Sequence, residues 1–552
     1  MYHIKLKAGI LLLAIIIFSA VLRIVWLGNF PASLYTDEAD QGYNAYSILL
    51  TGRDEHGVFL PVSMRSFGDW KPPLPTYLMI PFIYFSDLNS VAIRMPSALS
   101  GVGTIVLTYL LVVELFSRQK YKTKIALLSA FFLSISPWHI LQSRSAMLVV
   151  ISLFFLEAGV LFFLWYRKKA SMLIFSAIFF SLSIYAYYGM RVITPLVILL
   201  MYLRERKNIV LLSKEVIVGF LAGIIILIPL FAGIVKNKDV LLGRAQTVSV
   251  FYDQGVKLLQ WEYIAQDGVK QVSPTITRLF HNNVTMYVQN IIRRYLSHFD
   301  GDYLFFTGDK AEPFEIPNMG ILYIPDGIFI LAGIILLIKR GYKGIDLLLG
   351  FLLISFIPAA FTFMTPSTNR TFNAVVPLVI FSSGCAVYLS SLMNKSIIPG
   401  LAISLVYTVL FAYFMQQYFL VLPKKHSDWW NWGWKQVVNY VSGVDSRYNN
   451  VIVADVNGMP YIYFLFYTKY NPALYQKQAV RPYVPDRFGF EHVEGFGKFW
   501  FPKNFEWKYV KNDLQKDTLY VVPADQAPGN DGYIKEIDNP AGKPLFKIFS
   551  SL

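Results

Sequence analysis

Apolar runs of about 20 residues recur along this chain, and they limit its fold more than any other feature. A helix of about 20 residues crosses the hydrocarbon core of a bilayer. The composition agrees, because 55% of the 552 residues are hydrophobic and only 15% are charged, which excludes a disordered chain and an ordinary soluble enzyme. The sequence therefore predicts an α-helical polytopic membrane protein with about eleven transmembrane helices. The predicted spans are residues 6–27, 91–116, 125–141, 147–166, 171–188, 192–203, 216–235, 321–338, 345–363, 372–393 and 397–420.

Clusters of Lys and Arg between the apolar runs predict the orientation of the chain. The segment 72–86 decides the parity, since it is apolar but has only about 15 residues and four prolines. If it does not cross, the basic clusters at 118–124, 167–169, 204–207 and 339–343 all share the side of the N-terminus, as the positive-inside rule requires. We therefore predict an interfacial or re-entrant helix there, within a first external loop at 28–90, and a retained signal anchor at 6–27. The net charge of +15 is thus a topology signal and does not predict a nucleic-acid partner.

Two further external regions are too long to be simple connectors, a loop at 236–320 and a tail at 421–552. Segments 451–456, 461–467 and 518–522 of the tail have the composition of short strands. The predicted domains are a transmembrane domain at 1–420 and a small extracytoplasmic α/β domain at 421–552. The chain has a single cysteine, Cys385, which lies inside an apolar run. Neither a disulfide framework nor a cysteine metal site is therefore expected.

The first external loop concentrates the acidic and basic residues that chemistry at a membrane surface needs. Asp37, alone or with Glu38, is a candidate general base, and Lys71 is a candidate for neutralising a phosphate leaving group. The alternative is structural, because Thr36, Asp37 and Glu38 also suit the first turn of a helix. The residues alone favour neither interpretation.

Other polar residues suggest weaker hypotheses. Asp54, Glu55 and His56 are consecutive, but neighbouring residues rarely converge on one metal ion, so a solvated turn is favoured. His139 and Arg144 stand at the external end of the third predicted span, where they either face a cavity or snorkel to the interface. Arg191 and Arg370 also lie at the external ends of predicted spans, and they are candidates for binding an anionic headgroup.

An ordered set of motifs resembles the bacterial members of the GT-C glycosyltransferase superfamily. The set begins with Asp37-Glu38-Ala39 and continues through residues 51–57, 71–74, 94–99, 136–139 with Arg144, and 304–309, with a looser likeness at 463–467. It is similar to the protein O-mannosyltransferase family and to the lipid A aminoarabinose transferases. The resemblance covers roughly the first 420 residues.

This resemblance implies a multi-pass enzyme that moves a sugar from a polyprenyl-phosphate carrier to a protein, lipid or cell-envelope glycan on the extracytoplasmic face of the cell membrane. Asp37 would be the catalytic base and Glu38 its neighbour. Lys71 would contact the lipid phosphate, as would Arg370 and Arg144. The further substrate-binding candidates are His56, Asp69, His139 and Arg191.

Two positions depart from the family pattern. Trp70 precedes Lys71 where the aminoarabinose transferases have a Glu, with Asp69 one position further back. Met147 and Leu148 follow Arg144 where relatives often carry an acidic residue. A second acid is therefore in doubt, so we assign no metal ligands and no certain cofactor, and a requirement for Mg²⁺ or Mn²⁺ stays open.

A rival hypothesis is a transporter or flippase that moves a lipid-linked sugar with the same basic residues and no base. The substitution Asp37→Asn separates the two, because only a transferase needs that carboxylate for turnover. The partners expected of a transferase are the polyprenyl-phosphate sugar, the acceptor and membrane lipids.

Overall fold

The computed structural model describes residues 2–207, 213–309, 312–392, 398–455, 459–486, 489–529 and 532–552. The chain divides into two compact units. The first comprises Met1–Leu22, Ser100–Gln142 and Leu148–Phe414, and the second Arg23–Leu99, Ser143–Met147 and Met415–Leu552. This division does not follow the predicted boundary at residue 420, because the first external loop joins the tail in one unit.

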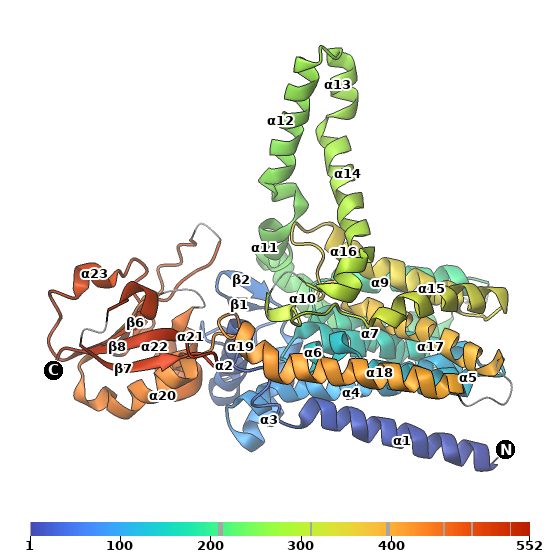
Figure 1. Ribbon diagram of the computed structural model, residues 1–552, viewed down its shortest axis with the longest axis horizontal. Helices are drawn as coiled ribbons and strands as arrows, with labels where there is room; N and C mark the ends of the chain where they lie inside the picture. Colours follow the sequence, from blue (N-terminus) through green and yellow to red (C-terminus); the bar gives the residue numbers. More distant parts are fainter. Residues whose placement is uncertain are drawn as a thin grey trace. The chain divides into compact units, whose positions relative to one another are not determined.

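The first unit is helical, as an apolar sequence requires where no water is available to bond the backbone (Figure 1). Each of the eleven predicted spans contains a helix, and the third contains two. The helices of these spans are α1 (Tyr2–Ile24), α4 (Ser90–Leu115), α5 (Lys122–Ile135), α6 (Pro137–Ser143), α7 (Leu148–Trp165), α8 (Met172–Ala186), α9 (Met190–Glu205), α10 (Lys214–Lys236), α15 (Ile324–Lys339), α16 (Ile345–Ala360), α17 (Val375–Leu392) and α18 (Ile398–Gln416). Between α10 and α15 lie α11 (Asp239–Val248), α12 (Gln254–Val269), α13 (Pro274–Phe280) and α14 (Asn283–Leu296).

Six helices of the described residues are long and apolar enough to cross a membrane, and a bent pair makes a seventh. The pair is α5 and α6, which meet at 60° where Pro137 follows the extended Ser136. Three shorter apolar helices include α8 and α16. The number of eleven spans therefore stays a prediction, and Met393 and Ile397, at the ends of two predicted spans, lie outside the described residues.

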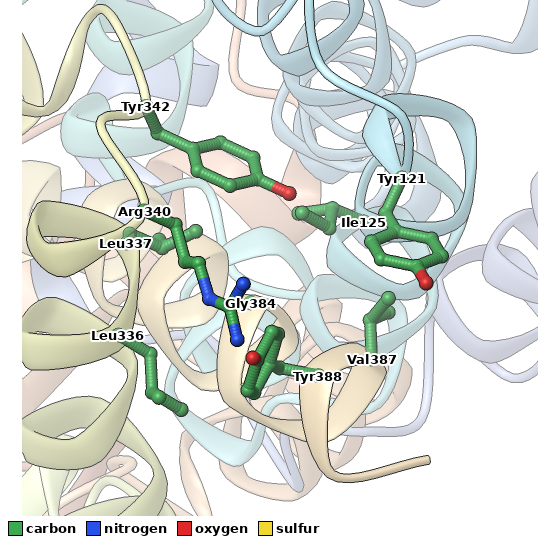
Figure 2. Close-up of a pocket in the computed structure, with 9 residues that line it drawn as sticks. All are labelled: Tyr121, Ile125, Leu336, Leu337, Arg340, Tyr342, Gly384, Val387 and Tyr388. Carbon is green, nitrogen blue, oxygen red and sulfur yellow. The ribbon is translucent and has the colours of Figure 1, made fainter. Parts of the chain in front are cut away.

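A crevice opens in the first unit between α15, α17 and the start of α5 (Figure 2). Arg340 lies over the ring of Tyr388, 4.6 Å from its centre, and Tyr121 and Tyr342 line the same opening. Its volume is about 10 Å³, which holds about one water molecule. The crevice is therefore too small for a lipid-linked substrate.

The second unit combines the first external loop with the tail. The loop supplies α2 (Thr36–Thr51), the antiparallel hairpin of β1 (Met64–Ser66) and β2 (Asp69–Lys71), and α3 (Leu74–Ser86). The tail supplies a six-stranded mixed sheet in the order β4-β5-β3-β6-β8-β7. Its strands are β3 (Asn450–Val453), β4 (Gly495–Phe496), β5 (Phe499–Trp500), β6 (Thr518–Pro523), β7 (Tyr533–Asp538) and β8 (Pro544–Ser550), and its helices are α19 (Leu422–Lys425), α20 (Trp434–Val444), α21 (Pro460–Thr468), α22 (Pro472–Gln478) and α23 (Trp507–Val510).

One hydrophobic core holds the loop and the tail of this unit together. It contains Tyr43 of α2, Val438 of α20 and Phe464 of α21, all fully buried or nearly so. Gly42 lets α2 approach α21 closely, since a Cβ atom there would stand 2.7 Å from the Phe466 ring. With 13 residues, α3 is shorter than a membrane span, in keeping with the predicted interfacial helix.

Of the three predicted strands of the tail, two are confirmed and one is wrong. The predictions at 451–456 and 518–522 are confirmed by β3 and β6, although Val456 lies outside the described residues. The predicted strand at 461–467 is wrong, because this segment forms α21. All residues from Pro460 to Phe466 are buried, so the run has no polar face, and a helix of this kind lacks the periodicity that distinguishes it from a buried strand.

Candidate active site

Helix α2 positions the acidic residues of the first loop. Tyr35 precedes the helix, and its backbone N–H donates to Glu38 Oε2 over 3.0 Å, which caps the N-terminus. Asp37 and Asp40 are three residues apart and therefore share a face of the helix. The side chain of Asp37 is 48% exposed, whereas that of Asp40 is 1% exposed. The loop thus presents one carboxylate to solvent and buries another beside it.

The β1–β2 hairpin brings Lys71 to these two carboxylates. Its ammonium donates to Asp37 Oδ1 over 2.7 Å and to Asp40 Oδ2 over 3.0 Å. Gly68, at a φ of 87°, forms the turn that returns β2 alongside β1. The structure therefore joins the predicted base and the predicted phosphate contact. Asp40 was not among the predicted residues, although its spacing from Asp37 was a usable signal.

The electrostatics of these three residues keep the lysine charged. Burial alone would lower the pKa of Lys71, but Asp37 and Asp40 outweigh it and raise that pKa. Burial raises the pKa of Asp40, and the Lys71 charge opposes this rise. A fixed ammonium therefore stands between a buried and an accessible carboxylate.

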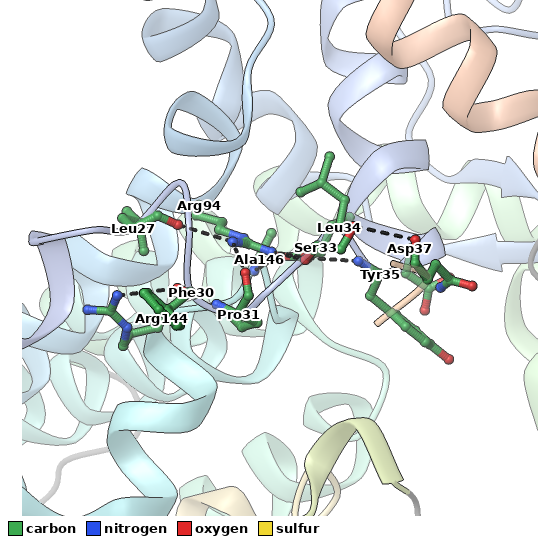
Figure 3. A network of polar contacts seen from close by, with 12 residues as sticks. Leu27, Phe30, Pro31, Ser33, Leu34, Tyr35, Asp37, Arg94, Arg144 and Ala146 are labelled. Atoms are coloured by element: carbon green, nitrogen blue, oxygen red, sulfur yellow. Dashed lines mark hydrogen bonds and ion pairs between the residues drawn. The ribbon is translucent and has the colours of Figure 1, made fainter. Parts of the chain in front are cut away.

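Glu38 makes a different set of contacts, with Arg94 and with backbone N–H groups. Its two carboxylate oxygens accept from Nε and Nη2 of Arg94, each over 2.8 Å, and Oε1 also accepts from the Ala146 N–H over 2.8 Å. Arg94 in turn donates to the backbone carbonyls of Leu27, Pro31 and Ser33 (Figure 3). The side chains of Glu38 and Arg94 are 1% and 0% exposed. This arrangement favours a structural role for Glu38 over the predicted catalytic one.

Arg144 is also enclosed by protein. It donates to the carbonyls of Val25 over 2.9 Å and Phe30 over 3.3 Å, and it lies 5.3 Å from the centre of the Phe419 ring. Figure 3 shows Arg144 on the far side of Arg94 from Asp37. Its position therefore favours holding the chain between α1 and α2 over the predicted contact with a lipid phosphate, and its burial does not fit a snorkelling side chain.

Three predicted residues belong to the first unit. His139 is buried beside the Phe372 ring, Arg191 donates to the carbonyl of Val240 over 2.7 Å, and Arg370 donates to that of Met364 over 2.8 Å. Asp37 and Lys71 belong to the second unit. Convergence of all these groups on one cavity therefore stays a prediction.

Asp54, Glu55 and His56 form a turn, as the sequence predicts. The turn is buried, whereas the sequence favours a solvated one. Asp54 Oδ1 accepts from the N–H groups of His56 and Val58 over 3.0 and 2.9 Å. The Glu55 carboxylate is fully buried, and its nearer oxygen is 3.6 Å from His56 Nε2. Arg481 donates to the Glu55 carbonyl over 2.8 Å, which ties this turn to the tail. Across the described ranges, no three His, Cys, Asp or Glu side chains form a group that could hold a metal ion.

Asp69 begins β2, two residues before Lys71. Its Oδ1 accepts from the backbone N–H of Trp70 over 2.8 Å, so the side chain braces the hairpin turn. The predicted role of Asp69 in substrate binding stays a prediction.

Burial shifts the pKa values of the three ionisable side chains in this turn, those of Asp54, Glu55 and His56. It lowers the pKa of His56 to about 3, with help from the charges of Arg481 and Arg65, and it raises the pKa of Asp54 to about 6. Burial likewise raises the pKa of Glu55. His56 is thus neutral in the folded protein at any pH where the protein is normally studied.

The substitution His56→Gln is expected to make the folded protein more tolerant of acid. Below pH 6.5 the unfolded chain protonates this histidine and the folded chain does not, so wild-type stability falls by about 1.4 kcal/mol per pH unit from this group. The variant lacks this loss. Unfolding midpoints in detergent at pH 4.5, 5.5 and 7.5 measure the difference between the two proteins.

His492→Gln is the matched control of opposite sign. Asp455 and Asp486 accept from the His492 ring and raise its pKa, so this histidine stabilises the fold at low pH and ceases to do so as pH rises through its folded pKa. Its loss should make the protein less tolerant of acid. Equal pH profiles for wild type and His56→Gln would contradict the burial of an uncharged His56.

Comparisons with known proteins find similar sequences and folds. Residues 14–235, which include α2, Lys71, Arg94 and Arg144, match the family model of dolichyl-phosphate-mannose-protein mannosyltransferases. ArnT from Cupriavidus metallidurans in the apo state has a similar structure, with a TM-score of 0.54 over 99% of this chain and 98% of that one, at 10% identity. The chain therefore resembles the O-mannosyltransferases over residues 14–235 and shares the fold of ArnT. The predicted resemblance to these proteins is confirmed.

Two further structures support the GT-C fold. ArnT from the same organism bound to undecaprenyl phosphate gives a TM-score of 0.53 at 11% identity, over 99% of this chain and 97% of that one. The oligosaccharyltransferase of Archaeoglobus fulgidus, in complex with Zn and sulfate, gives 0.50 at 15% identity over 83% of this chain. The match covers only 61% of that longer protein. A comparison with curated protein sequences finds no match.

The arrangement of Asp37, Asp40 and Lys71 is suited to one kind of chemistry. An accessible carboxylate can take a proton from an acceptor, and an ammonium beside it can stabilise negative charge on a leaving group. Asp40 holds Lys71 from the buried side, so that the ammonium keeps its place when Asp37 moves or changes charge. The arrangement needs no third protein group to combine a base with an anion contact.

Proposed function

We propose that this protein transfers a sugar from a polyprenyl-phosphate carrier to an acceptor on the extracytoplasmic face of the membrane. One observation carries the proposal, namely the 2.7 Å contact between the half-exposed Asp37 carboxylate and the Lys71 ammonium, which Asp40 anchors from behind. A base and a phosphate contact are the two groups that such a transfer requires. The acceptor is a protein, a lipid or a cell-envelope glycan.

The reaction follows from the positions of these groups. Asp37 takes the proton of the acceptor hydroxyl or amine, and the freed electron pair forms a bond to the anomeric carbon. The bond from that carbon to the phosphate oxygen breaks, and its electron pair leaves with the polyprenyl phosphate. Lys71 stabilises the charge that develops on the departing phosphate. Attack from the side opposite the leaving group inverts the anomeric centre.

Several findings support this assignment over its rival. The family model that matches is that of enzymes named for dolichyl-phosphate-mannose, and one structure of similar fold was solved with undecaprenyl phosphate. The positive-inside pattern supports an external location for the first loop. No observation favours the flippase. The A. fulgidus relative was solved with zinc, so a divalent cation belongs among the conditions to be tested here.

A transfer assay tests the proposal directly. Purified protein in lipid is given a panel of radiolabelled polyprenyl-phosphate sugars and an extract of envelope acceptors, with EDTA or with Mn²⁺. Label should appear in an acceptor and disappear from one donor, in a manner that depends on the enzyme. If no donor is consumed under either condition but labelled lipid changes leaflet, the transferase assignment is wrong and the flippase replaces it.

Lys71→Met is expected to lower kcat/KM for the donor by about 10²-fold, since it removes the one ammonium held at the base. Removing the charge also leaves Asp40 buried without its cation, so folding has to be measured alongside by thermal unfolding. The double variant Lys71→Met/Asp40→Asn removes both charges and should recover stability without recovering transfer.

Lys469→Met is the control for loss of a lysine from the same unit, because Lys469 is exposed and pairs only on the surface with Asp87. It should leave kcat/KM unchanged. Normal transfer by the stable double variant would contradict the role of Lys71 at the phosphate.

A further inference from the structure

The external loop between α10 and α15 folds into a helical hairpin of α12, α13 and α14 (Figure 1). The hairpin has a small core of its own, in which Val250, Val256 and Met286 are buried. In Figure 1 it stands out from the first unit and runs across the direction of helices such as α15 and α17, which belong to the same unit. If those helices cross the membrane, the hairpin runs parallel to its surface.

The outer face of each helix of this hairpin is apolar. On α14 an exposed apolar side chain recurs at every fourth position, at Val284, Val288, Ile292 and Leu296, each between 48% and 72% exposed. On α12 the exposed apolar residues include Leu258, Trp261 and Val269, and at the tip they include Ile276, Leu279 and Phe280. A helix in water would carry polar residues at such positions, so these stripes point to an apolar partner.

The base of the hairpin lies at the depth of an apolar helix. The Tyr295 hydroxyl donates to the carbonyl of Leu353 over 3.0 Å, and the Phe299 ring lies 4.7 Å from that of Phe356. Leu353 is seven residues before the end of α16 at Ala360, which corresponds to about 10 Å along the helix. The base of the hairpin therefore contacts the apolar part of α16 and not the segment beyond its end.

Exposed apolar residues continue from α16 onto the hairpin. Leu353 is half exposed, and Phe361 and Phe363 beyond the helix end are about as accessible. The backbone N–H of Phe363 donates to the carbonyl of Val248, the last residue of α11, over 2.9 Å. Exposed apolar residues therefore occur both at the end of α16 and along the hairpin.

The charges of the hairpin complement a phospholipid surface. Residues 253–296 contain five Lys or Arg and three Asp or Glu. Arg294 pairs with Asp253 at the base, and Asp267 lies 3.3 Å from His281, so two of the three acids are engaged within the hairpin. Lysine and arginine beside an apolar stripe favour headgroup phosphates, and Trp261 suits the same layer.

We propose that the α12–α14 hairpin lies in the headgroup layer of the membrane, with its exposed apolar stripes inserted among the lipids. It would hold the end of α16 at a fixed depth. The inference concerns lipid binding and is independent of the transfer reaction.

Depth-dependent quenching in the full-length protein tests this proposal. The background is Cys385→Ser, which removes the single cysteine of the chain. Fluorophores are attached at Leu258→Cys and Val288→Cys, with Lys257→Cys and Gln289→Cys as neighbouring controls on the same helices. The proteins are reconstituted in nanodiscs of phosphatidylcholine and phosphatidylglycerol, and quenched by lipids with a doxyl group or by aqueous iodide.

Labels at 258 and 288 should be quenched at least several-fold more by doxyl lipid than the labels at 257 and 289, and iodide should show the reverse order. Equal access of iodide to all four labels would overturn the proposal, because the hairpin would then project into water. Protection of 258 and 288 from both quenchers, with crosslinking between two copies, would overturn it in favour of a protein partner.

Discussion

Replacing Asp37 by Asn is expected to reduce kcat for sugar transfer by about 10³-fold or more, within the range known for the loss of a general base. The amide has the same shape as the carboxylate but cannot take the proton of the acceptor. Binding of the donor should persist, because Lys71 keeps its contact with Asp40, 3.0 Å away. The experiment measures kcat at saturating donor and, separately, the affinity for the polyprenyl phosphate.

Asp87→Asn is the matched control for this change. Asp87 is an exposed acid of the same unit that pairs with Lys469 on the surface, so its loss should leave both parameters unchanged. Near wild-type turnover by Asp37→Asn would show that another group is the base. If wild type and Asp37→Asn both moved lipid between leaflets and neither transferred sugar, the result would instead support a flippase.

The Asp37–Lys71 contact shows how much of the site the sequence could predict. The chemistry of both residues and their place in motifs indicate a role in the site, and the structure joins them across 34 positions of sequence. The spacing of Asp40 from Asp37 indicates a shared helix face, but it does not indicate that Lys71 approaches that face. This lysine comes from the β1–β2 hairpin, and no periodicity within residues 64–71 indicates where the hairpin packs.

The grouping of the first loop with the tail in one compact unit is a feature that the sequence did not indicate. Hydropathy divides a chain by its local composition, whereas the compact units depend on contacts between distant segments. The Tyr43 hydroxyl donates to the Tyr470 carbonyl over 3.0 Å, and Arg65 pairs with Glu491. Contacts of this kind join residues more than 400 positions apart, and a single sequence carries no record of them.

Glu38 illustrates the same limit at the level of one residue. Its neighbour Asp37 has the same chemistry, and the helix alone would leave both in its first turn. The distinction arises from Arg94, which comes from α4 and neutralises Glu38 in a space closed to water. Charge and capping patterns predicted that acids belong there, but not which of the two would be buried.

The largest loss of stability is expected from Glu38→Gln. The amide leaves the Arg94 guanidinium buried without its counter-charge, and breaking a buried ion pair in this way costs about 3–5 kcal/mol. The double variant Glu38→Gln/Arg94→Met removes both charges and should recover much of that loss. Denaturant titration of the detergent-solubilised protein measures the free energy of unfolding of each variant.

The same variants decide between a structural and a catalytic Glu38. If the carboxylate only holds Arg94 and the chain around Ala146, the fraction of Glu38→Gln that is folded at low temperature should keep a kcat within about 10-fold of wild type, since only the placement of α2 is disturbed. Glu506→Gln, on an exposed pair with Lys508, should change neither stability nor kcat. A Glu38→Gln protein with unchanged stability and a kcat as low as that of Asp37→Asn would contradict the structural role. Glu38 would then act on the substrate, and the ion pair with Arg94 would have to open during turnover.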